Sequence, residues 1–371
     1  MNNKFIKYHI SKINHRITFC HDKEAEDISQ DLKRLFSDKK MLLIIDKRIN
    51  KDVIKNLYKD LKHLGYRIFP MYVEGSKKNK NEKLLFKIID ELINKKFTKK
   101  SLILSCGGGV VGDVSAMAAS LYLRGMIYYH IPSTMTAIVD SCIGGKTGIN
   151  YKNIINSMGS YYHPQNVFIS KNMIELLPQR EFIAGFAEII KSGLLNDKKI
   201  LKILDKKIIK IFDRDFNILR EIITLTLKTK IKFFINDIFE NNQRLFLNFG
   251  HTFAHAIEMS LQSKISDVIR HGEAVGIGML CEIYYTEGKS KNYNLLKKYL
   301  SSFGLPHNIQ GFFKKNHKIR LKKEIYKNIF LDKKKISKYP RIISIKNSIK
   351  PKVIEMKSNK RIKKTKYKII F

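Results

Sequence analysis

The chain has 371 residues, 44% of them hydrophobic, and a formal net charge of +38 at pH 7. This length allows two domains or one large one with a core of ordinary size, and the apolar content excludes a disordered chain. The first residues lack the continuous apolar run of a signal peptide, and no segment approaches the roughly 20 apolar residues of a membrane span. We therefore expect a cytoplasmic protein with no membrane partner. Its four cysteines form no CxxC pair, so we expect reduced thiols.

The excess of basic residues has two interpretations. One is binding to nucleic acid or to an anionic membrane. The other is compositional drift, because Lys, Ile and Asn are abundant throughout the chain and Trp is absent. The lysines are spread along the sequence, and the densest basic stretch, residues 350–371, carries no recognised nucleic-acid motif. We therefore expect no specific nucleic-acid partner.

The first half of the chain alternates short apolar segments with helical ones. Residues 41–46 (MLLIID) are an apolar run that ends in Asp46, which is typical of a buried strand. Strands that alternate with helices of about 10 to 15 residues predict a parallel sheet covered on both faces. We expect further strands at 67–73, from 101 into a glycine-rich turn, and at 127–134, with helices at 50–64, 81–96 and 114–125.

Beyond about Pro178 the apolar residues follow helical periodicity almost everywhere. We therefore expect an α/β domain over residues 1–175 and a mostly α-helical domain over residues 176–371. Ligands of such sheets bind beyond the carboxyl ends of the strands, commonly where two domains meet.

Two glycine-containing motifs follow predicted strands. GGGVVGD, from Gly107 to Asp113, joins a strand to a helix, where glycines let the backbone approach a pyrophosphate and the helix supplies N–H donors. The motif departs from G-x-G-x-x-G in its spacing, and tight turns also use glycine for purely structural reasons. DSCIGGKTGIN, from Asp140 to Asn150, places Lys146 beside a donor-rich turn that suits a phosphate. Taken alone, Lys146 is better explained as a surface lysine, since the chain has 71 lysines and arginines.

The helical half gathers histidines and acids that could hold a metal. GFAEIIKSG places Glu188 and Lys191 on one helical face, and NFGHTFAHAIE does the same for His251 and His255. His271 follows in RHGEAV. One carboxylate and two histidines can bind zinc and leave a fourth position open. Each histidine alone is better explained as a structural residue, whereas three histidines and a glutamate together favour the two explanations about equally.

Jointly and in this order, the motifs GGGVVGD, DSCIGGKTG, GFAEIIK, NFGHTFAHAIE and HGEAV resemble the 3-dehydroquinate synthase family over roughly residues 40 to 340. The resemblance implies a Rossmann-like NAD-binding α/β domain followed by a helical domain that binds metal and substrate. It implies a lyase of the shikimate pathway, which leads to aromatic amino acids. This enzyme converts 3-deoxy-D-arabino-heptulosonate 7-phosphate to 3-dehydroquinate and phosphate, with a transient redox step on NAD and with Zn²⁺, or Co²⁺, as Lewis acid.

The same resemblance implies roles for individual residues. Metal ligands are Glu188, His251 and His271. Catalytic residues are His255, Glu240 and Lys191. Substrate contacts are Arg124, Asp140, Lys146, Asn156, Arg244, Asn248 and Lys334, with Lys333 as the alternative to Lys334. NAD contacts are Asp46, Gly108, Gly109, Val110, Val111, Gly112, Asp113, Ser133, Thr134 and Lys146. In the family the arginine matched by Arg124 comes from the neighbouring subunit, which implies a homodimer.

The chain departs from the family pattern mainly at cofactor positions. An acidic residue, two lysines and a threonine of the family are replaced here by Ser76, Asn79, Ile155 and Leu176, although Lys80 follows one place after Asn79. We expect these changes to weaken NAD binding more than metal chemistry. Three alternatives remain: another sugar-phosphate cyclase, a metal-dependent alcohol dehydrogenase of similar design, or a decayed enzyme kept as a basic binding protein. We favour the synthase because Asn156, Lys191, Arg244 and His255 are retained.

Overall fold

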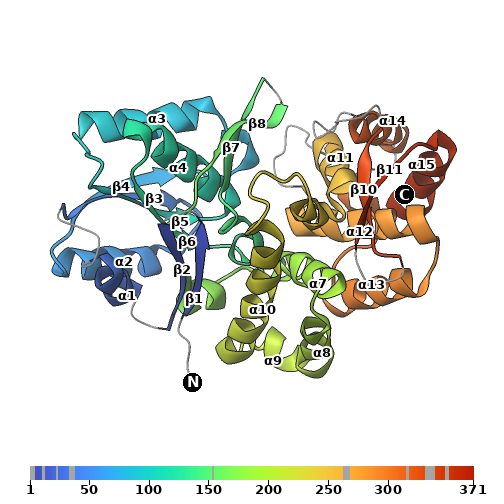
Figure 1. Cartoon of the computed structure of the whole chain (residues 1–371), viewed down its shortest axis with the longest axis horizontal. Helices are drawn as coiled ribbons and strands as arrows, with labels where there is room; N and C mark the ends of the chain where they lie inside the picture. Colours follow the sequence, from blue (N-terminus) through green and yellow to red (C-terminus); the bar gives the residue numbers. More distant parts are fainter. Residues whose placement is uncertain are drawn as a thin grey trace. The chain divides into compact units, whose positions relative to one another are not determined.

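The computed structural model describes residues 5–10, 13–21, 24–32, 38–152, 154–261, 268–314, 317–330, 339–346 and 351–371. The chain divides into two compact units, which Figure 1 shows in sequence colours. The first unit comprises Met1–Pro178 and Ile209–Leu227, and the second comprises Gln179–Ile208 and Lys228–Phe371. The sequence pattern did not suggest the return of 209–227 to the first unit. The functional division between residues 175 and 176 stays a prediction.

The first unit is built on a seven-stranded sheet with the order β1-β2-β9-β6-β5-β3-β4. Its strands run parallel except for β1, which pairs antiparallel with β2. A separate antiparallel hairpin, β7–β8, belongs to the same unit. The strand bounds are β1 Phe5–Ile10, β2 Ile13–Cys20, β3 Lys40–Asp46, β4 Arg67–Val73, β5 Leu102–Gly107, β6 Ile127–Pro132, β7 Lys146–Tyr151, β8 Ile154–Tyr161 and β9 Asn166–Ser170.

Helices cover both faces of this sheet because successive side chains of a strand point to opposite faces (Figure 1). Ile45 packs in a buried cluster with Leu57 of α2, whereas its neighbour Ile44 packs in another with Ile88 of α3 and Ala118 of α4. The predicted fold class, an α/β sheet followed by a helical part, is confirmed. Helix bounds are α1 Glu24–Leu32, α2 Lys51–His63, α3 Glu82–Asn94, α4 Gly109–Leu121, α5 Lys171–Glu175, α9 Ile208–Phe212 and α10 Phe216–Phe234.

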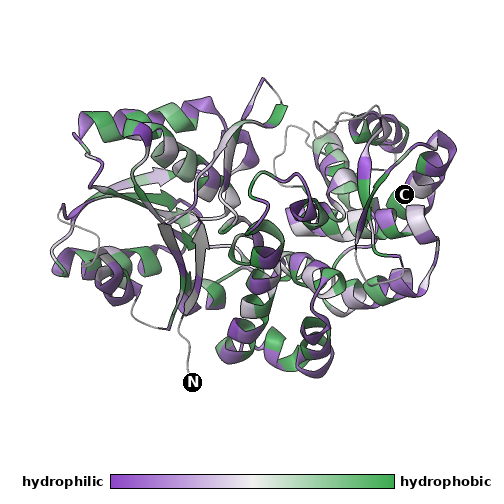
Figure 2. Ribbon diagram, viewed as in Figure 1, coloured by the Kyte–Doolittle hydropathy of each residue, from purple (hydrophilic) through white to green (hydrophobic). Residues whose placement is uncertain are grey.

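The second unit is mainly helical, with one short antiparallel ladder of β10 Arg341–Ser344 and β11 Lys352–Glu355. Helix α12 has buried residues along almost its whole length, and Figure 2 shows it as far less hydrophilic than α15. Among the described residues, no helix is long and apolar enough to cross a membrane. The helix bounds are α6 Gln179–Ala184, α7 Phe186–Leu195, α8 Lys198–Lys206, α11 His251–Leu261, α12 His271–Glu287, α13 Lys291–Ser302, α14 Lys318–Ile329 and α15 Asn359–Thr365, the last continued by the π-helical turn η7 Lys366–Ile370.

Candidate functional site

Three helices of the second unit bring one carboxylate and two imidazoles together. Glu188 lies in the first turn of α7, while His251 and His271 are the first residues of α11 and α12. Glu188 Oε1 lies 3.7 Å from His251 Nε2 and 3.8 Å from His271 Nε2. One ligand atom from each residue lies within 4.8 Å of the others. The three residues that the sequence set apart as metal ligands therefore form one cluster.

Glycines allow these helices to approach so closely. A Cβ atom on Gly272, the residue after His271, would lie 1.7 Å from the backbone oxygen of Ala184. A Cβ on Gly278, farther along α12, would lie 2.0 Å from the backbone oxygen of Gly250, the residue before His251. No larger side chain fits either contact without moving a helix. The glycines of HGEAVGIG thus fix the separation of α12 from its neighbours, and with it the separation of the three side chains.

Hydrogen bonds at Nδ1 orient both histidines toward Glu188. His251 Nδ1 lies 3.2 Å from the backbone oxygen of Phe249, and His271 Nδ1 lies 3.3 Å from both carboxylate oxygens of Glu258. A carbonyl or carboxylate oxygen can only accept, so each Nδ1 carries the hydrogen and each Nε2 presents its lone pair. Both lone pairs therefore belong to the nitrogens that lie nearest Glu188 Oε1.

The two oxygens of Glu188 have different surroundings. Oε2 forms an ion pair with Lys191, whose Nζ also donates to the backbone oxygen of Leu247 at 2.8 Å. Oε1 is buried and accepts no hydrogen bond from the residues that the structure describes. A buried carboxylate oxygen without a donor is costly unless a cation takes the donor's place. Two ligand atoms about 2.1 Å from a tetrahedral zinc ion lie roughly 3.4 Å apart, so this donor set fits zinc.

His255 stands one helical turn beyond His251 and beside both histidine ligands. Its ring centroid lies 5.5 Å from that of His251 and 6.3 Å from that of His271. It is partly exposed, whereas Glu258, three residues later, is buried. Glu258 belongs to the motif NFGHTFAHAIE, but no role was predicted for it. A signal was present, because positions 251, 255 and 258 share one helical face.

A turn before α11 carries three other predicted residues. Asn248 Nδ2 donates to Glu240 Oε1 at 2.5 Å, and Glu240 adopts a φ of +62°. Arg244 is only 2% exposed, and its Nη1 donates to the backbone oxygen of Ile238 at 2.6 Å. Asp237 supports the turn by accepting the backbone N–H groups of 241, 242 and 244. The predicted residue Lys334, with its alternative Lys333, lies outside the described residues.

In the first unit, the glycine-rich turn joins β5 to α4 at the carboxyl edge of the sheet. Gly108 caps α4 and, as a glycine, offers no side chain of its own to the N–H donors of the first helical turn. Ser133 and Thr134 follow the neighbouring strand β6, and Ser133 N–H donates to the Gly107 oxygen at 2.9 Å. Asp46 ends the next strand, β3, where Arg48 Nη2 pairs with it at 2.8 Å. The predicted NAD contacts of the first unit thus occupy one edge of the sheet.

A buried polar chain lies beneath this turn. Ser105 Oγ lies 2.7 Å from His130 Nδ1 and 2.9 Å from the Tyr128 hydroxyl, which donates to the backbone oxygen of Gly112 at 3.1 Å. Burial lowers the pKa of His130 to about 4, and burial likewise raises the pKa of Tyr128. A Cβ on Gly112 would lie 3.0 Å from His130 Nε2. This neutral network holds the first turn of α4 against the sheet.

Lys80 occupies the cofactor edge near the position where the family lysine is missing. Its Nζ lies 2.5 Å from Asp113 Oδ2 and donates to Asn156 Oδ1 at 2.6 Å. Asn79 turns instead to the backbone oxygen of Glu74, at 3.1 Å. Among the other departures, Ser76 is buried and Leu176 is 53% exposed. A lysine therefore reaches Asp113 and Asn156 from position 80.

The remaining predicted substrate contacts lie on irregular segments of the first unit. Asp140 belongs to the π-helical turn η3 (Ala137–Ser141), and Lys146, which opens β7, is exposed. Arg124 is exposed at φ +61° in the turn η2 (Tyr122–Arg124). The structure gives their positions and leaves their contacts with substrate as predictions.

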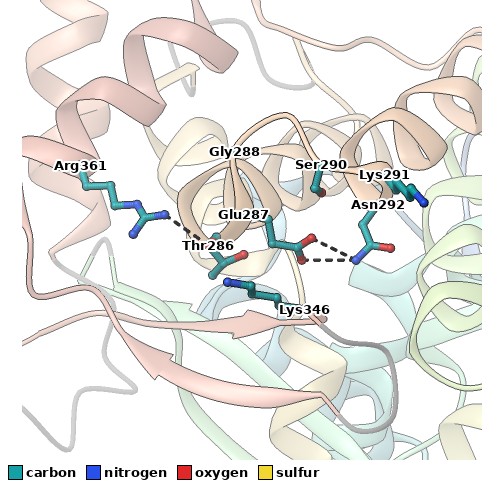
Figure 3. A pocket seen from close by; sticks show the side chains of 8 residues that line it. All are labelled: Thr286, Glu287, Gly288, Ser290, Lys291, Asn292, Lys346 and Arg361. Atoms are coloured by element: carbon teal, nitrogen blue, oxygen red, sulfur yellow. Dashed lines mark hydrogen bonds between the residues drawn. The ribbon is translucent and has the colours of Figure 1, made fainter.

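The second unit also has a polar pocket of about 660 Å³ at the other end of α12 (Figure 3). Helix α12 runs from His271 to Glu287, so the pocket lies about 24 Å along the helix from the metal cluster. In Figure 3 the one acid, Glu287, accepts from Asn292, and Arg361 donates to the backbone oxygen of Thr286. No histidine or cysteine among the described residues lines it, so it lacks the donor set of the cluster at the start of α12. Its lining residues are Thr286, Glu287, Gly288, Ser290, Lys291, Asn292, Lys346 and Arg361.

Comparison with known proteins places most of the chain in one family. Residues 70–184 match the family model "3-dehydroquinate synthase N-terminal", and residues 185–335 match "3-dehydroquinate synthase C-terminal". A 3-dehydroquinate synthase of Clostridium tetani is 37% identical over 281 residues, covering 74% of this chain and 73% of that protein.

Solved structures agree on the fold. The 2-epi-5-epi-valiolone synthase of Streptomyces hygroscopicus, with NAD⁺ and Zn²⁺ bound, superposes with a TM-score of 0.82 at 18% identity, covering 96% of this chain and 97% of that one. A 2-deoxy-scyllo-inosose synthase in complex with carbaglucose-6-phosphate, NAD⁺ and Co²⁺ gives a TM-score of 0.81 at 21% identity, covering 97% and 98%.

Proposed function

We propose that Glu188, His251 and His271 form the metal centre of a 3-dehydroquinate synthase, since the chain belongs to the 3-dehydroquinate synthase family. The reaction is the release of phosphate from 3-deoxy-D-arabino-heptulosonate 7-phosphate and closure of the remaining carbon chain to 3-dehydroquinate. The observation that carries the proposal is the buried Oε1 of Glu188, which has no donor among the described residues and lies within 3.8 Å of two imidazole Nε2 atoms.

The cofactors are NAD and a divalent metal, Zn²⁺ or Co²⁺, as in the two solved neighbours. When bound, the metal supplies Lewis acidity at a substrate oxygen, and NAD supplies a reversible oxidation of a substrate alcohol. Glu188, His251 and His271 would hold the metal, and NAD would lie along the glycine-rich turn of the first unit. The NAD contacts we propose are Asp46, Gly108, Gly109, Val110, Val111, Gly112, Asp113, Ser133, Thr134 and Lys146.

Lys191 tunes the metal centre without being a ligand. Its ammonium group neutralises Glu188 Oε2 and leaves Oε1 for the metal. Because Lys191 is 2% exposed and also donates to the backbone oxygen of Leu247, its position is fixed before any ligand arrives. Loss of this lysine would leave a buried carboxylate with one neutralising partner fewer.

His255 is the proposed proton carrier. It lies beside the two histidine ligands, and its partial exposure gives it access to substrate and solvent. Glu240 and Asn248 are bonded to each other at 2.5 Å, so each fixes the other in the turn that precedes α11. We propose that Asn248 binds a substrate hydroxyl and that Glu240 assists proton transfer.

The substrate is an anion, and cations and amides of this chain would bind it. We propose Asp140, Lys146 and Asn156 of the first unit as contacts, together with Arg244 of the second. Arg124 would enter the site of a neighbouring copy. Its exposed position beside Leu121 and Leu123, which are 50% and 44% exposed, supports a homodimer. Residues 1–175 would then bind NAD, and residues 176–371 would bind the metal. A cytoplasmic location is supported by the four cysteines, all buried thiols.

Phosphate release tests this function directly. The full-length protein, stripped of metal and reloaded with Zn²⁺, is supplied with the heptulosonate phosphate at increasing NAD concentrations. We expect release of one phosphate per 3-dehydroquinate formed, with no net NADH. Glu188→Gln should abolish turnover and stoichiometric zinc binding together. No release at any NAD concentration by zinc-loaded protein would overturn the proposed activity, and a fully zinc-loaded Glu188→Gln variant would overturn the metal assignment.

A further inference from the structure

The last helices of the second unit form a strongly basic surface that the synthase reaction does not use. Helices α14 and α15 and the turn η7 contain eleven lysines and arginines and a single glutamate. In Figure 2, α15 is coloured hydrophilic over most of its length. Helix α15 and η7 lie beyond residue 335, where the match to the family ends.

Three of these lysines pack against two tyrosine rings. Lys322 Nζ lies 4.7 Å from the ring centre of Tyr367, and Lys366 Nζ lies 4.8 Å from the same ring. Lys366 and Lys363 also lie 5.0 and 5.8 Å from the ring centre of Tyr326. Lys366 Nζ donates to the backbone oxygen of Lys322 at 2.9 Å, which joins η7 to α14. We name Lys322, Tyr326, Lys363, Lys366 and Tyr367 the Lys–Tyr surface.

No carboxylate balances these charges. The glutamate of α14, Glu324, pairs with Arg320, and no ion pair to Lys322, Lys363 or Lys366 occurs within the part of the chain that the structure describes. Burial lowers the pKa of Lys366, and the charges of Lys322 and Lys363 lower it further. Like charges held together cost free energy, which a bound anion would return. Drift toward lysine explains their number and does not explain their concentration around two rings.

We propose that the Lys–Tyr surface binds single-stranded nucleic acid without sequence preference. Lys322 and Lys363 would contact successive phosphates, and Tyr367, whose side chain is 51% exposed, would stack on a base, whereas Lys366, which is 4% exposed, holds η7 on α14. A duplex keeps its bases stacked inside and would use only the lysines, so the exposed ring favours a single strand. A membrane surface would need an apolar face to insert, and the exposed large apolar side chains of these helices are Ile319 and Tyr367 alone.

Fluorescence anisotropy with the full-length protein tests the proposal. The probe is a labelled single-stranded RNA of 20 mixed nucleotides at several salt concentrations, with a duplex of the same sequence and anionic vesicles as competitors. The double variant Lys322→Gln/Lys363→Gln should lose roughly tenfold in affinity at 0.1 M salt, and the magnitude of its salt slope should fall by about 1.4 because two phosphate contacts are lost. Tyr367→Leu should lose at least about fivefold for the single strand with an unchanged slope.

A matched charge change elsewhere provides the control. Lys55 and Lys59 are exposed on α2 of the first unit, so Lys55→Gln/Lys59→Gln removes the same charge without touching the surface. We expect its affinity to stay within twofold of the unchanged protein. Equal losses in the two double variants would overturn the proposal in favour of diffuse net charge. Tighter binding of the duplex or the vesicles, or no effect of Tyr367→Leu, would overturn the choice of a single strand. Phosphate release by each variant reports that it is folded.

Discussion

The metal cluster and the glycine-rich turn are held in place by different means. In the second unit, three side chains each contribute one atom, and the separation of helices α7, α11 and α12 sets their distances. In the first unit, the donors are backbone N–H groups at the start of α4, and the neighbouring side chains come from turns. A cluster of side chains depends on the identity of every residue, whereas a backbone turn depends mainly on its glycines.

This difference explains where the chain departs from its family. Ser76, Asn79, Ile155 and Leu176 all lie in the first unit, and Ser76 and Asn79 belong to one short turn at residues 76–79. There a neighbour can replace a lost group, as Lys80 does for position 79 by bonding Asp113 and Asn156. The metal cluster allows no such replacement, because a ligand moved by one residue on a helix turns by about 100° away from the metal. Four substitutions test this contrast.

The largest effect is expected where two backbones touch. In Gly272→Ala, the new Cβ would lie 1.7 Å from the backbone oxygen of Ala184, so α12 must move away from the α6–α7 junction. We expect the free energy of unfolding to fall by roughly 4 kcal/mol or more, with loss of the zinc site. Urea unfolding and zinc content measure this. Gly311→Ala is the control, because its Cβ would meet no atom within 4 Å. Normal zinc content in Gly272→Ala would show that the close approach does not set the ligand positions.

The polar chain under the glycine-rich turn should make stability depend on pH. In the folded protein, burial lowers the pKa of His130 to about 4, below the usual 6.5 of histidine, so the unfolded chain takes up the proton first. Its contribution is complete above pH 6.5 and is lost as pH falls toward 4, by about 3 kcal/mol. Urea unfolding at pH 7 and pH 4 should show this loss in the unchanged protein. Between pH 7 and pH 4, the free energy of unfolding of His130→Gln should fall by about 3 kcal/mol less than that of the unchanged protein. If the two proteins lost the same free energy over this range, His130 would not be a buried neutral histidine.

A smaller effect is expected from Glu258, whose carboxylate bonds Nδ1 of the proposed metal ligand His271. Glu258→Gln removes the charge that holds the Nδ1 hydrogen of His271 and directs its Nε2 lone pair toward Glu188. We expect zinc affinity to fall by about 10- to 100-fold with the fold intact. Competition with a chelator measures the affinity. Met259→Leu, at the next position of α11, should leave it unchanged, and equal affinity in the two variants would remove Glu258 from the positioning of His271.

The sequence predicted the parts of the fold that rest on local periodicity. The apolar runs at 41–46 and 67–73 became β3 and β4. Strand β3 is buried along nearly its whole length and is therefore apolar on both faces, whereas β4, at the edge of the sheet, is buried only at Met71 and Val73. The strands β1, β2 and β9 and the hairpin β7–β8 were not predicted. Strand β8 is exposed at most of its positions and carries no apolar alternation that a period of two would reveal. Residues 209–227 pack with the first unit, and helical periodicity cannot predict this because it does not show which unit a helix packs against.

For the candidate site, the motifs predicted which residues lie together, and the packing of the helices determines the distances and hydrogen bonds between them. The spacing of His251 and His255 placed both on one helical face. The structure adds Glu258, on the same helix α11, which bonds His271 of α12. The sequence held no sign that Gly272 and Gly278 set helix separations, because a glycine's contact with a distant backbone is not a local property. The sequence showed only that Lys80 follows Asn79, the position at which the family has a lysine. Its bonds to Asp113 and Asn156 could not be predicted, because Asp113 lies on α4 and Asn156 on β8, far from Lys80 in the sequence.

The smallest effect is expected at Lys80, the lysine one place after Asn79. This prediction bears most directly on the contrast between the two units. Lys80→Met removes both bonds to Asp113 and Asn156, so we expect NAD to bind about tenfold more weakly by calorimetry, with zinc content unchanged. Lys78→Met is the control, since Lys78 is exposed two positions away. Asn79→Lys restores the family residue, and we expect less than a twofold gain because the cluster already holds an ammonium group. A tenfold gain in Asn79→Lys, with no loss in Lys80→Met, would show that the turn does not tolerate a shifted lysine. The cofactor edge would then depend on residue identity as strictly as the metal cluster does.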